Sequence, residues 1–189
     1  MNKPEIINLY TESNPNPNSL KFVTNYMLMP EGESRDFRTV DLTEQAPLAK
    51  SLFDFPFVKG VFYMSNFITV TKDESVEWFE VKDDVQAAIK KYLMSGDPIL
   101  LEDKSSHQIE GSDDLEAKIR GILDEYIKPA VEMDGGAITF HSFDEGKLKV
   151  LLQGSCSGCP SSTVTLKSGI ENLMRRMVPE VEEVLAEEI

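Results

Sequence analysis

Two cysteines three positions apart are the residues best suited to chemistry in this sequence. Cys156 and Cys159 lie in the run GSCSGCP that ends at Pro160, and they are the only cysteines among 189 residues. Thiolates bind metals and take part in disulfide exchange, and the unpaired N–H groups at a helix start stabilise them. Gly154 and Gly158 let the backbone approach a bulky bound group. The run predicts a thiol site where a strand turns into a helix.

Three interpretations fit this pair of thiols. As a metal or cluster clamp it supplies two ligands where a cluster or a structural zinc takes four, so the other two would come from a second chain or an external thiol. As a redox pair it needs no further ligand, and as an inert pair it is two small buried residues. The proline follows the second cysteine and no aromatic residue adjoins the motif, which disfavours the redox interpretation.

Other candidate groups are weaker. A zinc site within one chain would need His107 and His141, and neither has zinc-finger spacing to the cysteine pair. The pattern places His141 on the solvent face of a strand. Asp134 stands before two glycines, a position typical of a turn-forming residue rather than of a catalytic acid.

A helix is predicted ahead of the site. Ser112 is a suitable N-cap, and a glycine-rich turn over residues 134–136 ends the helix. Its apolar side chains recur at helical spacing: Leu115, Ile119, Ile122, Leu123, Tyr126, Ile127 and Ala130.

Two strands and a second helix are predicted around the site itself. Alternating segments over 137–143 and 147–153 flank a hairpin turn. The second helix starts at Pro160 and ends before Pro179. The tail over 181–189 fits either a short helix or an edge strand.

The first half of the chain has a different arrangement of elements. The pattern predicts strands over 20–24, 58–63 and 67–71 and helices over 47–53 and 81–95. Gly96 ends the last helix, and the Gly, Pro and Ser content that follows indicates a linker. We therefore expect an α+β protein of two small α/β domains, over residues 1–96 and 113–189, joined by a linker over 97–112.

Composition narrows the classes of partner. The net charge of −14 disfavours nucleic acid, and residues 97–189 carry −10 of it. No apolar run is long enough to cross a bilayer, so no membrane association is expected. No signal or transit peptide is recognisable, which predicts a cytoplasmic protein.

The stretch from Leu115 to Val184 resembles the C-terminal NifU-like domain of Nfu proteins. The similar pieces keep their order and spacing: ILDEYIKPAVEMDGGAITF, LLQGSCSGCPSSTVTLKSGIENLM and VPEVEEV. The first half resembles the Nfu N-terminal domain through NPNPNSLKFV, PLAKSLF and VKGVFYMSNFITVTK. Lys128 and Ala137 depart from residues that are common in the family.

The resemblance implies an iron–sulfur cluster carrier rather than an enzyme. In this family the C-terminal domain is an α-β-β-α-β unit, so the tail would be a third strand. Cys156 and Cys159 would bind the cluster and metal, a [4Fe–4S] cluster with [2Fe–2S] as the alternative, shared between two protomers of a homodimer. The cluster would come from a donor and pass to apo iron–sulfur proteins, and the N-terminal domain would serve protein contacts.

Overall fold

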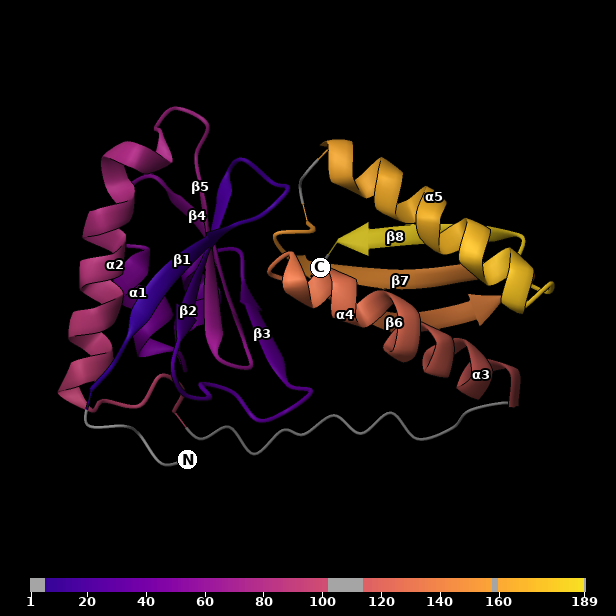
Figure 1. Cartoon of the computed structure of the whole chain (residues 1–189), viewed down its shortest axis with the longest axis horizontal. Helices are drawn as coiled ribbons and strands as arrows, with labels where there is room; N and C mark the ends of the chain where they lie inside the picture. The colour runs from indigo at the N-terminus through magenta and orange to yellow at the C-terminus, as the bar shows by residue number, and fades with distance from the viewer. Residues whose placement is uncertain (1–5, 102–113, 158–159, 189) are drawn as a thin grey trace. The chain divides into compact units, whose positions relative to one another are not determined.

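The computed structural model describes residues 6–101, 114–157 and 160–188, and it describes the side chains in these ranges except those of 160–165 and 188. The chain divides into two compact units, Met1–Ser105 and Ser106–Ile189, which are described separately below. Each unit combines helices with one sheet, which confirms the predicted α+β class of two small domains (Figure 1). Part of the predicted linker, residues 102–112, lies outside the described residues, and the domain boundaries stay a prediction.

The first unit is an antiparallel sheet with helices on one face. Its strand order is β1-β2-β5-β4-β3. The elements are β1 (Leu9–Ser13), β2 (Ser19–Thr24), β3 (Ser34–Phe37), a 3-10 turn η1 (Val40–Thr43), α1 (Pro47–Leu52), β4 (Val58–Met64), β5 (Phe67–Lys72) and α2 (Trp78–Ser95). Side chains of both α-helices and of β2, β4 and β5 share one buried core.

Local sequence accounts for the best-defined parts of this unit. The predicted hairpin forms between β4 and β5, and Ser65 turns the chain with a positive φ of 47°. Helix α2 begins three residues before the predicted start because Glu77 and Glu80 form a reciprocal capping box. It ends at Gly96, whose φ of 87° is the left-handed conformation that stops helices.

The second unit is a three-stranded sheet of mixed direction, with order β6-β7-β8. Its elements are α3 (Asp114–Ile122), a π-helical turn η2 (Leu123–Ile127), α4 (Lys128–Met133), β6 (Gly136–Asp144), β7 (Lys147–Gly154), α5 (Pro160–Met177) and β8 (Glu183–Glu188). Strands β6 and β7 form the predicted antiparallel hairpin, whereas β8 runs parallel to β7. The tail is therefore the third strand that the family resemblance implied, and its helical alternative is wrong.

The predicted first helix of this unit is interrupted. Lys128 donates its N–H to the carbonyl of Leu123, five residues back, which makes the turn π-helical. Pro129 follows and has no N–H to donate, so the regular pattern of α-helical hydrogen bonds cannot continue through it. The sequence pattern alone gave one continuous helix here.

Alternation along β7 builds the core of the second unit. Leu148, Val150 and Leu152 are buried in one cluster with side chains of α3, α4 and α5, and Met174 of α5 is fully buried among them. On the other face of the sheet Lys149 of β7 pairs with Glu187 of β8, at 3.1 Å between Nζ and Oε1. The strand therefore separates an apolar face from a charged one.

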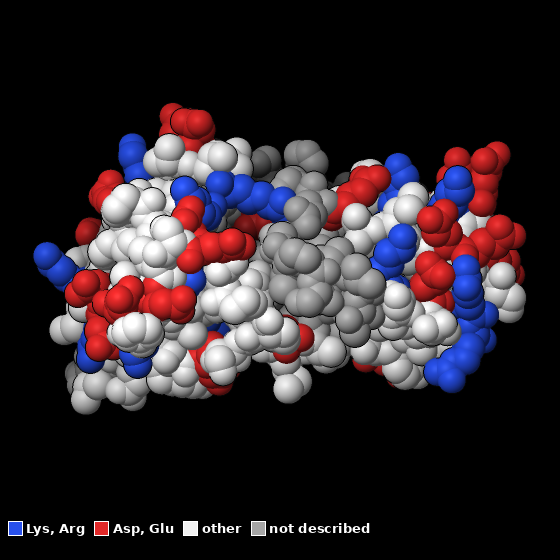
Figure 2. Space-filling view, turned by 90° about the horizontal axis from the view of Figure 1, so that it is seen from above, with Lys and Arg blue, Asp and Glu red and all other residues white. Residues whose placement is uncertain are grey.

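Charge covers much of the surface. Figure 2 shows acidic side chains on the visible surface of each unit, with Lys and Arg between them. Within the residues that the structure describes, no helix combines the length and the apolar character needed to cross a bilayer.

Candidate metal centre

Cys156 lies just beyond the end of β7. The strand ends at Gly154, whose φ of 66° turns the chain, and α5 starts at Pro160. The Cys156 side chain is only 6% exposed and belongs to the core of the second unit. Cys159, the other predicted ligand, lies outside the described residues.

A glycine makes room for the Cys156 thiol. Gly136 opens β6 and pairs with Gly154 across the sheet. A Cβ atom on Gly136 would lie 2.8 Å from the Cys156 sulfur and 2.6 Å from the backbone oxygen of Gln153. Real Cβ atoms do not approach other atoms so closely, so this position requires glycine.

Ser155 fastens the cysteine loop to the turn that follows α4. Its hydroxyl donates to the carbonyl of Asp134, and its N–H donates to the carbonyl of Gly135 at 3.3 Å. The Ser155 side chain is buried, and its oxygen lies 3.9 Å from the sulfur of Cys156. Two segments about twenty residues apart in sequence are thereby held together beside the thiol.

Ser157, the residue after Cys156, closes a tight turn. Ser157 donates both its N–H and its hydroxyl to the carbonyl of Gly154, at 3.2 and 2.9 Å. The Cys156 thiol is therefore held by a backbone that hydrogen bonds fix on either side. Such a loop presents sulfur with little freedom of position, which suits binding of a metal or a cluster.

The other predicted candidates do not join Cys156. His141 lies on β6 with about half of its side chain exposed, and its Nδ1 is 3.6 Å from Glu187 Oε2. Asp134 forms the turn, as predicted, and acts through its backbone carbonyl. His107 lies outside the described residues. Among the residues that are described, no group of three or more His, Cys, Asp or Glu side chains could hold a metal ion.

Sequence reasoning identified the small residues around the cysteines but missed the role of Gly136. Its need for glycine depends on the register between β6 and β7, which brings it against residues seventeen and twenty positions later in the chain. The Gly135-Gly136 pair was visible in the sequence and was assigned only to the turn. The turn interpretation is correct for Gly135, which has a φ of 79°.

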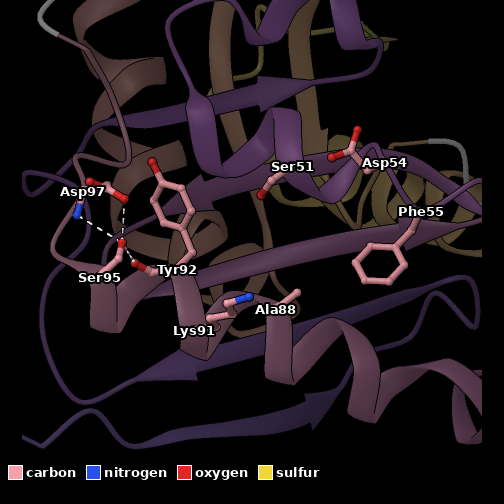
Figure 3. A pocket seen from close by; sticks show the side chains of 8 residues that line it. All are labelled: Ser51, Asp54, Phe55, Ala88, Lys91, Tyr92, Ser95 and Asp97. Carbon is pink, nitrogen blue, oxygen red and sulfur yellow. Dashed lines mark hydrogen bonds between the residues drawn. The ribbon is translucent and has the colours of Figure 1, made fainter.

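The first unit contains a pocket of about 410 Å³ that is a second candidate site (Figure 3). It lies between α1 and α2. Ser95 donates its hydroxyl to Asp97, and the Tyr92 hydroxyl donates to the carbonyl of Pro98. Burial first, and then the charge of Asp97, raise the pKa of Tyr92, which keeps it a donor rather than a base. These polar groups serve local structure.

Two family models match the chain. The one described as "Scaffold protein Nfu/NifU N terminal" matches residues 9–96, and the one described as "NifU-like domain" matches residues 119–185. Among solved structures, the chain is similar to a NifU-like protein from Saccharomyces cerevisiae. That similarity has a TM-score of 0.47 and 28% identity, over 55% of this chain and 92% of the other.

Curated relatives match nearly the whole chain. It is 42% identical over 179 residues to a protein of Drosophila willistoni and to one of Drosophila persimilis, both named "NFU1 iron-sulfur cluster scaffold homolog, mitochondrial". The matches cover 93% of this chain but only 62% and 64% of those proteins. The chain thus spans less than two thirds of the length of these relatives.

These names correct one prediction. Both relatives are named as mitochondrial, which contradicts the predicted cytoplasmic location. That prediction relied on seeing no targeting segment, and such an absence does not identify a compartment. The order of the two matched domains and the extent of the similarity establish that the chain belongs to the Nfu family.

Proposed function

We propose that this protein carries an iron–sulfur cluster between copies of itself and delivers it to apo-proteins. Support comes from the family, whose matched relatives are named iron–sulfur cluster scaffolds. The observation that carries the proposal is the fixed thiol of Cys156, held beside Gly136 and Ser155 at the end of β7. Cys159 would be the second ligand from the same chain.

The number of thiols per chain indicates a cluster site shared between two chains. An iron–sulfur cluster takes about four thiolates, and each chain has two cysteines. A two-fold dimer supplies two identical pairs, which is the simplest symmetric solution. We propose a [4Fe–4S] cluster as the cargo, with [2Fe–2S] as the alternative. A site completed by two chains is opened when the chains separate, so release to an acceptor can accompany dissociation.

The chain's own residues would position and release this cargo. Gly136 leaves space next to the sulfur, and Ser155 holds the loop while ligands exchange. Delivery exchanges thiolate ligands and changes no bond in an organic substrate, so we propose a carrier and not an enzyme. Its partners would be a cluster donor and apo iron–sulfur proteins, in mitochondria as the names of the relatives suggest. The net charge of −14 disfavours nucleic acid as a partner.

Anaerobic reconstitution with iron and sulfide tests the proposal. We expect visible absorbance from thiolate-bound iron and about half a cluster per chain, which is about two irons for [4Fe–4S] and about one for [2Fe–2S]. The loaded protein should have the mass of a dimer and should transfer its cluster to an apo-ferredoxin.

Two variants make the experiment specific. Cys156→Ser should bind no stable cluster, whereas His141→Ala should load normally because His141 is half exposed on β6. A Cys156→Ser protein that carries clusters normally would overturn the proposal. So would a colourless protein that binds about half a zinc per chain and takes up no iron.

A further inference from the structure

The first unit contains a large groove that is separate in its residues from the cysteine site. Its volume is about 940 Å³, near the upper end of the roughly 300–1,000 Å³ typical of ligand pockets. Two of its walls are residues 26–30 and 96–101, and side chains of β3, of the η1 region and of α2 complete it. We call it the apolar groove.

Hydrogen bonds hold both walls in place. Leu28 and Met29 donate their N–H groups to the carbonyl of Ser65 at 2.7 and 2.9 Å, which pins the first wall to the β4–β5 hairpin. On the second wall, the Tyr92 hydroxyl donates to Pro98, and Leu101 donates to the carbonyl of Gln45 at 2.8 Å. A groove fixed in this way loses little conformational entropy when a ligand enters.

Several large apolar side chains line the groove. Among its lining residues, Leu28, Met29 and Leu93 are buried. Met27 and Leu42 line it while 41% and 57% exposed. Large apolar side chains gathered at the rim of a concave surface mark binding sites more often than chance exposure does.

Acidic residues lie in the groove and next to its lining residues in sequence. Glu33 and Asp97 line the groove, and Arg35, the one cation among its described lining residues, is paired with Glu33 at 3.8 Å. Exposed carboxylates also adjoin lining residues in sequence, at Glu31 and Asp41. A partner that fits therefore has apolar side chains at its centre and positive charge around them.

We propose that the apolar groove docks a short apolar segment of a partner protein, flanked by Lys or Arg. The apolar side chains of the segment fill the space between the two walls, and its basic flanks face the acidic residues. All the lining residues that the structure describes belong to the first unit. The inference therefore does not depend on the cysteines, and its failure would leave the proposed function untouched.

Fluorescence anisotropy of the full chain with labelled peptides tests this. The probe is the peptide Lys-Lys-Leu-Phe-Leu-Leu-Lys-Lys, compared with one that has Glu for every Lys and one that has Ser for every apolar residue. We expect saturable binding of the first peptide. Each of the other two should bind about tenfold more weakly or worse, because one loses the charge match and the other the apolar burial.

Matched variants locate the binding. Leu42→Asp should weaken binding about tenfold or more, since burial of one leucine contributes that much affinity. Phe79→Asp is the control: Phe79 is 74% exposed on α2, does not line the groove and receives the same charge. It should change affinity by less than about twofold. Equal losses in both variants would overturn the inference, because they would indicate general attraction of a basic peptide to an acidic protein.

Two charge-reversal variants distinguish an effect of the acidic residues at the groove from an effect of the net charge. Glu33→Lys and Asp83→Lys change the net charge equally, but only Glu33 lines the groove. Of these two variants, only Glu33→Lys should weaken binding of the lysine peptide.

Flotation with phosphatidylcholine–phosphatidylglycerol vesicles tests whether the groove binds a lipid surface instead of a peptide. Vesicle binding that Leu42→Asp abolishes, without peptide binding to the native chain, would overturn the proposal.

Discussion

The two units use hydrogen bonds to fix different kinds of feature. In the second unit, the contacts of Ser155 and the close approach of Gly136 are gathered around one sulfur atom. In the first unit, the contacts that position the apolar groove are spread along two walls, at Ser65 and at Gln45. The second unit therefore fixes the position of one thiol, whereas the first unit fixes the shape of an open groove.

This difference has a consequence for mutation. A site that depends on the position of a few atoms loses its function when one of them moves. Around Cys156 the contacting atoms include backbone, which cannot easily adjust. A surface made of many apolar side chains loses binding in steps, since each side chain contributes separately. Substitutions beside Cys156 should therefore have large effects, and single substitutions elsewhere should have smaller ones.

The largest effect is expected from Gly136→Ala. The new Cβ would meet a backbone oxygen and the Cys156 sulfur, so the strands must shift, and overpacking of this kind costs about 1–3 kcal/mol of unfolding free energy. Hydrogen exchange of β7 amides measures the loss in the second unit. Reconstitution should also give less bound cluster, because the sulfur is displaced.

Gly169→Ala on α5 is the matched control for this change. A Cβ at that helical position would meet no atom within 4 Å, so alanine should leave the unit as stable or slightly more stable. Equal destabilisation by the two substitutions would contradict the special role of Gly136.

Ser155→Ala should have the next largest effect. It removes the hydroxyl bond to the carbonyl of Asp134, and loss of a buried hydrogen bond costs about 1–2 kcal/mol. Because the loop is then held less firmly, iodoacetamide should alkylate Cys156 faster, and peptide mass spectrometry distinguishes Cys156 from Cys159. The exposed Ser168→Ala on α5 should leave the rate unchanged. An unchanged rate in Ser155→Ala would show that the loop does not need this bond.

Local patterns predicted the elements whose signals are complete within a few residues. The β4–β5 and β6–β7 hairpins, α2 and α5 follow from apolar periodicity together with turn and cap residues. Two edge strands, β1 and β3, were not predicted. The sequence of β3 is Ser-Arg-Asp-Phe, which lacks the alternation of a half-buried strand, and pairing with β4 alone makes it a strand.

The candidate site was predictable only in part. The position of Cys156 between a strand and a helix followed from sequence, as did the turn at Asp134. The contact of Gly136 with the sulfur did not, because it arises from strand pairing at long range. The third strand came from the family resemblance, since its short mixed pattern fits two elements equally well. The roles of Cys156 and Cys159 as ligands both stay predictions.

The next largest expected effect is a loss of stability at alkaline pH, which should occur in the first unit and not in the second. Burial raises the pKa of Tyr63 well above its ordinary value of 10.0, with a smaller contribution from Tyr92. The unfolded chain then loses this proton at lower pH than the folded one. The stabilisation is therefore complete below pH 10 and is lost as pH rises above it, by about 1.4 kcal/mol per pH unit.

Urea unfolding followed by fluorescence measures this in the first unit, because Trp78 is the only tryptophan. Tyr63→Phe keeps the ring and should flatten the dependence above pH 10. The second unit has one tyrosine, the half-exposed Tyr126, and hydrogen exchange there should show no comparable loss. A first unit whose stability is constant from pH 9 to 11 would contradict the burial of an un-ionised Tyr63.

The smallest effect is expected from Asp73, in the turn between β5 and α2. The Ser75 N–H, which donates to its carboxylate at 2.9 Å, is the main cause that lowers the pKa of Asp73 below its ordinary 3.8, and the side chains of Ser75 and Lys59 add to it. A lowered pKa gives stability that is present above the ordinary value and is lost as pH falls through the lowered one. Asp73→Asn should therefore lower the urea midpoint of Trp78 fluorescence at pH 7 and much less at pH 3. Asp83→Asn, exposed on α2, should change neither midpoint, and equal shifts in both variants would assign the effect to net charge rather than to the turn.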